Sequence, residues 1–240
     1  MRLRGAADAL VSVLLPAPCR LCGEMLDAAG RIPICSRCLA SLIPYAGPSC
    51  DTCGNPLVSR VAADTAAKAL CPVCRRGLYH FDFARSYGAY TPAMAGAIIL
   101  LKHHHVLPLG GWFAAKLADV AAQHPGLREV DVVVPVPQHR LRQRERGYNH
   151  AELIGKPLAR RLGLPCRSFL LLRTKPRPEK LKLTLRERWR TVRGAYAVQQ
   201  GTHVDNLRVL LVDDVFTTGA TLDACSRTLC EAGASYIAAL

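Results

Sequence analysis

Four C-x-x-C pairs within the first 75 residues constrain the fold of this chain more than any other feature of its sequence. The pairs are Cys19-Cys22, Cys35-Cys38, Cys50-Cys53 and Cys71-Cys74. They contain eight of the eleven cysteines in 240 residues. A spacing of two residues lets both sulfur atoms of a tight turn bind one tetrahedral Zn²⁺ ion, and a structural zinc site takes four such ligands. The sequence therefore predicts two structural Cys₄ zinc sites.

The pairs can be combined into two sites in more than one way. We predict consecutive zinc ribbons, 19/22/35/38 and 50/53/71/74, with a cross-braced arrangement of alternate pairs as the alternative. An iron–sulfur cluster is a lesser alternative, and metal-free cysteines are disfavoured because the segment has too few apolar residues to fold unaided. No convincing secretion signal is present, which argues against disulfides. The remaining cysteines are expected to be small buried side chains: Cys166, Cys225 and Cys230.

Residues 1–18 imitate a signal peptide, because two arginines precede an apolar stretch. Asp8 interrupts that stretch, however, and Pro16 and Pro18 end it. We therefore predict an amphipathic helix. No apolar run approaches the roughly 18 residues that a membrane span requires, so we predict no membrane span and expect the protein in the cytoplasm.

Apolar runs and helical periodicities alternate along the rest of the chain. Strands are predicted over 81–90, 130–137 and 208–212, and a further strand opens at 235 and is cut short at Leu240. Helices are predicted over 94–117, 151–163 and 221–234. This alternation predicts an α/β domain with an open, doubly wound parallel sheet and helices on both faces. We divide the chain into the N-terminal helix, a cysteine module over 19–78 and the α/β domain over 79–240.

Two adjacent carboxylates, Asp213 and Asp214, directly follow the predicted strand that ends at residue 212. Ligands of open parallel sheets bind outside the carboxyl ends of the strands. The loop that follows offers backbone N–H groups, hydroxyls and a helix N-terminus to an anion: Thr217, Thr218, Gly219, Ala220 and Thr221. Carboxylates accept hydrogen bonds from hydroxyls or bind Mg²⁺. An ordinary strand–turn–helix does not explain two crowded acids, whereas a 5-phosphoribose satisfies both the loop and the acids.

The pattern D-D-x-x-T-T-G-A-T after an apolar strand resembles the phosphoribosyl pyrophosphate (PRPP) signature of type I phosphoribosyltransferases. The resemblance implies that Asp213 and Asp214 bind the 2′ and 3′ hydroxyls of the ribose, with Mg²⁺, and that residues 217–221 bind the 5′-phosphate.

Two further segments, DVVVPVPQHRLRQRERGYNHAELI and RERWRTVRGAYAV, resemble segments of the ComF competence proteins, as does the cysteine module. This resemblance covers nearly all of residues 15–240. It implies a double zinc ribbon before a type I phosphoribosyltransferase-like domain, and a role in handling imported DNA during natural competence. The chain departs from the residues usual in that family, Gln, Asn and Gln, at three positions: His150, Thr191 and Lys180.

A single basic segment explains almost the whole charge imbalance of the chain. Residues 139–193 contain 17 Lys and Arg against 4 Asp and Glu, a net +13 of the formal +14. Such a concentration indicates an anionic partner. In phosphoribosyltransferases the loop after the first core strand binds pyrophosphate, and residues 173–190 would form a closing hood with Lys175, Arg177, Lys180 and Lys182. The candidate pyrophosphate or anion contacts are Lys102, Pro137, His139, Arg142, Arg146 and Asn149.

Two functions of different classes remain open at this point. The first is a phosphoribosyltransferase that joins a nitrogen nucleophile to C1 of the ribose, with no catalytic general base that the sequence identifies. The second is a non-catalytic module for single-stranded DNA, in which the PRPP loop is a ligand sensor or vestigial. Three aromatic residues interleave with the basic segment as candidate stacking surfaces: Tyr148, Trp189 and Tyr196. Histidines 103–105 are not predicted to bind one metal ion, because consecutive helical residues point in different directions.

Overall fold

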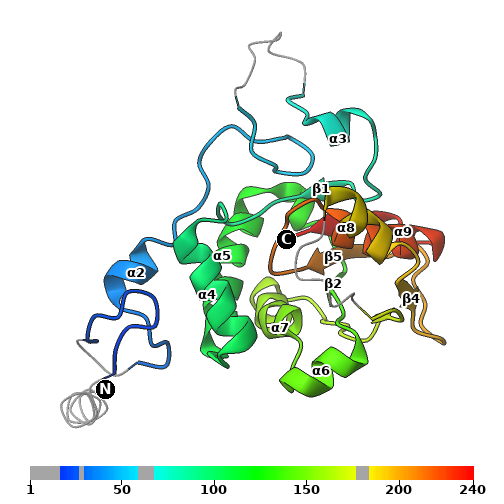
Figure 1. Ribbon diagram of the computed structural model, residues 1–240. Helices are drawn as coiled ribbons and strands as arrows, with labels where there is room; N and C mark the ends of the chain where they lie inside the picture. The colour runs from blue at the N-terminus through cyan, green and yellow to red at the C-terminus, as the bar shows by residue number, and fades with distance from the viewer. Residues whose placement is uncertain (1–16, 27–29, 59–67, 177–183) are drawn as a thin grey trace.

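The computed structural model describes residues 17–26, 30–58, 68–176 and 184–240 (Figure 1). The predicted helix over 1–18 lies outside the described residues except at its last two positions, where Pro18 forms an isolated β-bridge with Met25. Within the described part of the chain, no helix combines the length and the apolar character needed to cross a bilayer.

A four-stranded parallel sheet lies at the centre of the molecule. Its order is β1 (Phe83–Ala84), β6 (Tyr236–Ala239), β5 (Arg208–Val212) and β2 (Val132–Pro135). All neighbouring strands in this sheet run parallel. The apolar runs of β2 and β5 are buried almost throughout, because helices cover both faces of the sheet and leave no strand face for solvent. The predicted open parallel sheet is confirmed.

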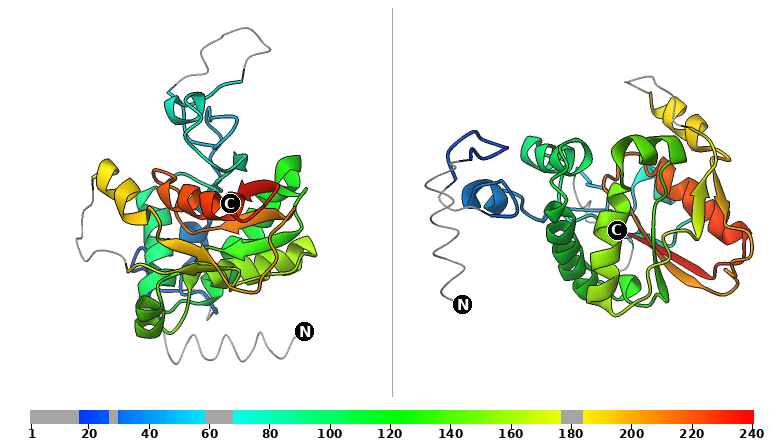
Figure 2. Two further views of the ribbon diagram at one scale, coloured as in Figure 1. Left: turned by 90° about the vertical axis from the view of Figure 1, so that its right-hand side faces the viewer. Right: turned by 90° about the horizontal axis from the view of Figure 1, so that it is seen from below.

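The alternation of side chains along β5 separates two apolar cores. Leu210 and Val212 belong to a core with α4 (Pro92–His103), α5 (Pro108–Gln123) and α7 (His150–Leu162). Val209 and Leu211 face the opposite core, where α8 (Leu185–Val192) and α9 (Ala220–Glu231) pack. Successive side chains of a strand point to opposite faces. The two further views show helices on both sides of the sheet (Figure 2).

Three predicted elements differ from the structure. The strand expected over 81–90 is only two residues long, because the backbone beyond it bonds elsewhere: the Tyr87 carbonyl accepts from Tyr45 N–H. The single helical stretch expected from 94 to 117 divides into α4 and α5, since Pro108 begins a new helix. An antiparallel pair, β3 (Leu171–Arg173) and β4 (Tyr196–Val198), was not predicted.

Short helices of the described chain lie at the second cysteine pair of each ribbon, before β2 and in the basic segment. They are α2 (Ser36–Ala40), α3 (Pro72–Arg75), η1 (Pro125–Leu127) and α6 (Arg140–Arg146), of which η1 precedes β2. The first ribbon lies beside α4 and the second beside β1 (Figure 1). Of the three isolated cysteines, Cys225 is buried as predicted and Cys166 is half-buried, whereas Cys230 is exposed. The prediction of a buried Cys230 was wrong, because its position on α9 faces away from the core.

Candidate metal centres and anion-binding cavity

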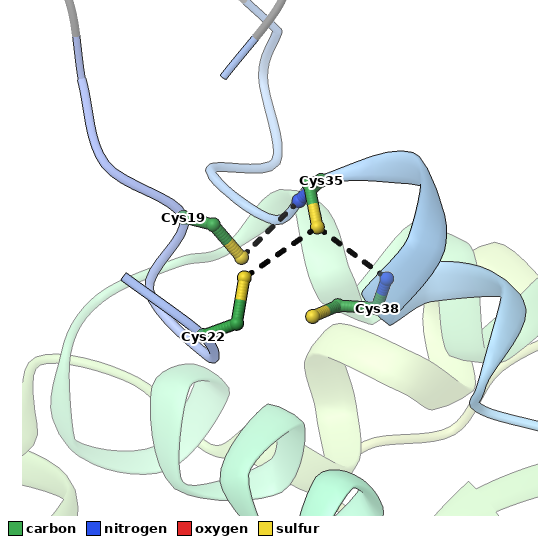
Figure 3. Close-up of side chains that lie close together, drawn as sticks. All are labelled: Cys19, Cys22, Cys35 and Cys38. Carbon is green, nitrogen blue, oxygen red and sulfur yellow. Dashed lines mark hydrogen bonds between the residues drawn. The ribbon is translucent and has the colours of Figure 1, made fainter. Parts of the chain in front are cut away.

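The eight cysteines form two separate clusters in the consecutive pairing, which excludes the cross-braced alternative. The clusters are Cys19, Cys22, Cys35 and Cys38, and Cys50, Cys53, Cys71 and Cys74. Within each cluster the sulfur atoms lie within 4.8 Å of one another, and Figure 3 shows the four side chains of the first cluster facing a common centre.

The spacing of the sulfur atoms fits a tetrahedral zinc site. One Sγ–Sγ distance in each cluster, Cys22–Cys35 and Cys53–Cys71, is 3.7 Å. A tetrahedron with Zn–S bonds of about 2.3 Å has edges of about 3.8 Å. Zinc in these sites would tie together loops that have little core of their own, which is a structural role.

Backbone N–H groups stabilise one thiolate in each cluster. Burial raises the pKa of the Cys19 thiol, but hydrogen bonds from backbone N–H groups, that of Cys35 foremost, lower the pKa to about 6. The pKa of Cys50 falls to about 7 for the same reason. Burial and neighbouring sulfur atoms raise the pKa of Cys38 and of Cys53 to about 12. All four sulfur atoms of a cluster can therefore be thiolates together only when a cation is bound.

A cavity of about 520 Å³ opens at the carboxyl ends of β2 and β5. It contains both predicted acids, the whole predicted phosphate loop and most of the predicted anion contacts. The predicted residues that line it are Lys102, Pro137, His139, Arg142, Arg146, Asp213, Asp214, Thr217, Thr218, Gly219, Ala220 and Thr221. Residues from distant parts of the sequence meet here because β2 and β5 are neighbours in the sheet and their following loops share one edge.

Asn149 is the predicted anion contact that the structure does not bring to the cavity. Its side chain is buried and caps α7, where Oδ1 accepts from the Ala151 N–H at 3.1 Å. Its Nδ2 donates to the Val136 carbonyl at 3.0 Å. In this structure Asn149 ties the start of α7 to the loop after β2, and its predicted contact with an anion stays a prediction.

The two acids have different surroundings. Lys102 Nζ and His150 Nε2 lie 2.6 and 2.8 Å from the same oxygen of Asp214. Burial alone would raise the pKa of Asp214, but the His150 imidazole and the Lys102 ammonium lower it to about 2. Asp213 has neither partner in contact and accepts the Asp214 N–H at 2.9 Å. Burial and the Asp214 carboxylate raise the pKa of Asp213 to about 6.

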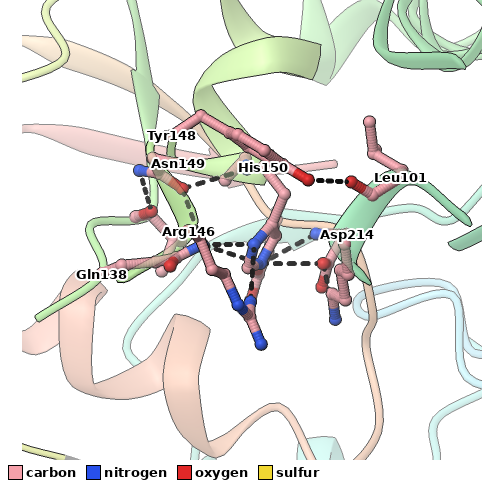
Figure 4. A network of polar contacts seen from close by, with 11 residues as sticks. Leu101, Gln138, Arg146, Tyr148, Asn149, His150 and Asp214 are labelled. Carbon is pink, nitrogen blue, oxygen red and sulfur yellow. Dashed lines mark hydrogen bonds and ion pairs between the residues drawn. The ribbon is translucent and has the colours of Figure 1, made fainter. Parts of the chain in front are cut away.

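His150 is a cavity residue that the sequence did not assign to the site. Figure 4 shows Gln138, Arg146 and Asp214 converging on its ring. Arg146 Nη1 lies 3.5 Å from His150 Nδ1, and Gln138 Nε2 contacts the same nitrogen. With donors on Nδ1, the proton of the ring lies on Nε2 and is directed at Asp214. The sequence did carry one signal for His150: it stands where the family usually has Gln, and both residues can donate a hydrogen bond to a carboxylate.

The predicted hood is described only in part. Arg177, Lys180 and Lys182 lie outside the described residues. Lys175 donates to the Arg193 carbonyl at 3.3 Å and does not line the cavity. Three other residues of this region line the cavity: Arg173, Arg188 and Thr191. Arg188 Nη1 donates to Thr217 Oγ1 at 3.0 Å and so reaches the phosphate loop from α8.

Two further hollows adjoin these elements. An apolar lobe of about 100 Å³ shares Asp213, Asp214 and Phe216 with the main cavity and extends between Tyr87 and Met94. A separate groove of about 630 Å³ lies between α8 and α9. Its lining includes the predicted stacking residues Trp189 and Tyr196, whereas the Tyr148 hydroxyl donates to the Leu101 carbonyl at 2.7 Å, away from that groove.

A double zinc ribbon domain model matches residues 10–75. Competence protein F of Haemophilus influenzae is 33% identical over 209 residues, which cover 85% of this chain and 87% of that protein. DNA utilization protein YhgH of Salmonella typhimurium is 28% identical over 226 residues, covering 93% and 95% of the two chains.

Two further similarities are weaker. Competence protein ComFC of Bacillus subtilis is 26% identical over 205 residues, covering 83% of this chain and 79% of that protein. A solved structure of glutamine PRPP amidotransferase from B. subtilis, complexed with ADP and GMP, matches 51% of this chain and 24% of that one, at 24% identity and a TM-score of 0.35. So low a score supports no inference from that structure. The ribbons, the parallel sheet and the identity to competence protein F over most of both chains together show that this protein belongs to the ComF family.

Proposed function

We propose that this protein binds PRPP with Mg²⁺ in the cavity at the carboxyl ends of β2 and β5. The observation that carries the proposal is the composition of this one cavity: two carboxylates, a phosphate-type loop at a helix N-terminus and several cationic side chains line it together. PRPP has a matching sequence of groups, with vicinal hydroxyls between a phosphate and a pyrophosphate.

Each part of the cavity suits one part of PRPP. The 5′-phosphate accepts hydrogen bonds from the loop 217–221, which begins α9. The hydroxyls of the ribose donate to Asp213 and Asp214. Pyrophosphate lies toward Arg142 and Arg146, because a guanidinium pairs with phosphate oxygens through two parallel hydrogen bonds. Lys102, held by Asp214 at 2.6 Å, adds a further positive charge on that side.

The donor set also fits Mg²⁺, which prefers carboxylate oxygens together with substrate oxygens. Bound Mg²⁺ would neutralise charge on the pyrophosphate as it leaves. The protein's own side chains have two further roles. The carboxylates orient the ribose, and the arginines stabilise the charge that develops on the leaving group.

If the site is catalytic, a nitrogen lone pair forms the new bond to C1 while the bond from C1 to the pyrophosphate oxygen breaks and its electrons leave with pyrophosphate. The lobe beside Asp213, Asp214 and Phe216 supplies a largely apolar space of about 100 Å³ next to the proposed ribose position. An acceptor placed there would be shielded from water, which competes as a nucleophile.

The second candidate function is binding of single-stranded DNA, and the groove between α8 and α9 favours it. That groove combines the side chains of Trp189, Arg190 and Arg193. Aromatic surfaces beside arginines bind bases and phosphates without sequence preference. The names of the relatives, DNA utilization protein and competence protein, support a role for the chain in DNA uptake. Under this second function the cavity binds PRPP as a sensor and does not transfer its phosphoribosyl group.

Calorimetric titration of the zinc-loaded protein with PRPP and Mg²⁺ tests the first proposal. We expect the Asp213→Asn, Asp214→Asn double variant to bind at least about tenfold more weakly than the wild type, because each hydrogen bond to a charged group contributes roughly 1.5–3 kcal/mol. Asp119→Asn, an exposed acid on α5 outside the cavity, is the matched control. Absence of PRPP binding by the wild type would overturn the ligand assignment.

Release of pyrophosphate distinguishes a phosphoribosyltransferase from a module that only binds PRPP. If the wild type binds PRPP but releases no pyrophosphate with any nitrogen base supplied, the binding module is favoured. For DNA, fluorescence anisotropy with a labelled oligonucleotide should show weaker binding by Trp189→Ala, and a smaller salt dependence for the Arg190→Ala, Arg193→Ala variant, because fewer phosphates are neutralised.

A further inference from the structure

An aromatic residue just after the second cysteine cluster holds the phosphate loop from behind. The Tyr79 hydroxyl donates to the Thr218 carbonyl at 2.9 Å. Its ring covers Gly219 so closely that a Cβ on Gly219 would lie 2.7 Å from the ring. Gly219 has a φ of 71°, in the left-handed region. Both the left-handed backbone and the close ring require glycine at this position.

The position of Tyr79 is fixed by packing on several sides. Its ring stacks on Phe81 with centroids 4.5 Å apart and on Trp189 at 6.1 Å, and meets the edge of Phe216 at 6.3 Å. The next residue adds a polar anchor, since the N–H and the ring Nδ1 of His80 both lie 2.9 Å from Asp223 Oδ1, in the first turn of α9. Residues 79 and 80 therefore hold the loop and the helix behind it.

This contact orients a donor for an anion. A trans peptide is planar, with its C=O and N–H on opposite sides. Because the Thr218 carbonyl points to Tyr79, the Gly219 N–H of the same peptide points away from Tyr79. Thr218 and Gly219 line the cavity and Tyr79 does not. Gly219 is buried, and its N–H donates to no other residue among those that the structure describes. A buried unpaired N–H at a helix N-terminus favours an anionic acceptor.

The same packing joins Tyr79 to the second metal centre. Tyr79 packs against the apolar core that contains Cys50, Cys53 and Cys71. The connecting turn is short and hydrogen-bonded, with Gly77 N–H donating to the Cys74 carbonyl at 3.0 Å. A cluster of four thiols keeps this arrangement only when a cation binds them. Among the described residues, the first cluster packs instead in the other core, beside α4.

We propose that Tyr79 is a positioning residue through which the second cysteine cluster, and not the first, orients the Gly219 N–H toward a bound phosphate. The inference rests on the proposed binding of PRPP in the cavity. It adds that the anion affinity of the loop depends on a residue outside the cavity and on the metal occupancy of one ribbon.

The test compares two removals of a single hydroxyl in the full-length, zinc-loaded protein. Tyr79→Phe keeps the ring and its stacking but loses the hydrogen bond to Thr218. Tyr236→Phe is the matched control, since its hydroxyl also donates to a backbone carbonyl, that of Gly126 at 3.0 Å, away from the cavity. We expect Tyr79→Phe to bind PRPP about three- to tenfold more weakly, the effect of one neutral hydrogen bond, and Tyr236→Phe to bind as the wild type does.

Amide hydrogen exchange of residues 217–221 without ligand provides a second measurement that needs no PRPP. Exchange should be faster in Tyr79→Phe than in the wild type and unchanged in Tyr236→Phe. Equal affinities and equal loop exchange in the two variants would overturn the role of Tyr79. If the wild type binds no PRPP, the proposed function fails, while the exchange measurement still decides whether Tyr79 holds the loop.

Discussion

The two zinc ribbons repeat one motif, yet they are built into the molecule to different degrees. In the first cluster Cys22 is exposed and Cys35 and Cys38 are half-buried, whereas three cysteines of the second cluster are buried. The first ribbon meets α4 through side chains such as Leu21, which lies over Gly96. The second ribbon pairs with the sheet through the backbone, where Ala84 N–H donates to the Thr52 carbonyl at 2.8 Å. Repeated motifs can thus be peripheral or integral according to what covers them.

The two ribbons also support different walls of the cavity. Helix α4, beside the first ribbon, ends near Lys102, which is held by Asp214. The second ribbon reaches the phosphate loop through Tyr79. The acids lie where these two walls meet, so substitutions on each side measure how strongly each ribbon is coupled to the site.

The largest expected effect comes from removing one matched ligand of each cluster. Cys53 and Cys22 both occupy the second position of the first pair, but Cys53 is buried and Cys22 is exposed. We expect Cys53→Ser to lower the free energy of unfolding by about 3–5 kcal/mol, because the loss of the metal opens the core below it. Cys22→Ser should cost clearly less. Urea unfolding measures both, and metal analysis should find two zinc ions in the wild type and one in each variant.

Equal losses of stability in the two variants would show that the two ribbons are equally integral to the fold. Fewer than two zinc ions in the wild type would contradict the two-site account itself.

Lys102→Met tests the wall formed by α4. Lys102 and Asp214 are a close pair with little exposure, 21% and 5% of their side chains. Removing the cation leaves a buried carboxylate with His150 alone, and we expect a loss of about 2–3 kcal/mol, somewhat below the usual cost of breaking a buried pair. Urea unfolding at pH 7.5 measures it. A loss below 0.5 kcal/mol, roughly the value for a surface pair, would show that Lys102 does not hold Asp214 in solution.

Asp213→Asn should stabilise the ligand-free protein while weakening PRPP binding. The pKa of Asp213 is raised from 3.8 to about 6 on folding. Between these values the folded state holds a proton that the unfolded state has released, so stability falls as the pH rises through this window. At pH 7.5 the variant should therefore gain about 1–2 kcal/mol over the wild type, and the gain should vanish below pH 4. A gain that does not depend on pH would contradict the assignment.

Leu21→Ala is the smallest expected change and acts on the first ribbon alone. Leu21 is a partly buried side chain against the α4 core, and we expect a loss of about 1 kcal/mol from the smaller apolar contact. PRPP affinity should not change, because Leu21 does not line the cavity. A drop in affinity like that of Tyr79→Phe would show that the first ribbon is coupled to the site as well.

Local patterns predicted the parts of the fold that local chemistry specifies. The cysteine spacings predicted two Cys₄ clusters but left their pairing open, and the β-branched and leucine runs predicted β2 and β5. The pair β3 and β4 was missed because its three-residue strands are too short to show a period. The strand predicted over 81–90 was too long at its C-terminal end, because the Tyr87 carbonyl accepts a hydrogen bond from the Tyr45 N–H. Tyr45 is far from Tyr87 in sequence, so a local pattern could not predict this contact.

The site was predicted in the same uneven way. The acids and the loop 217–221 carry a contiguous motif, so one stretch of sequence was enough to find them. Tyr79 and His150 were missed, because their partners Thr218 and Asp214 lie 139 and 64 positions away in the chain. Asn149 was assigned to the anion because it neighbours the arginines in sequence, although its side chain turns inward to cap α7.

We expect the second ribbon, and not the first, to hold the phosphate loop. Amide hydrogen exchange of residues 217–221 in Cys53→Ser and Cys22→Ser, both without ligand and under conditions where both are folded, tests it most directly. Exchange of this loop should be faster in Cys53→Ser than in the wild type and unchanged in Cys22→Ser. Equal exchange of the loop in the two variants would contradict it.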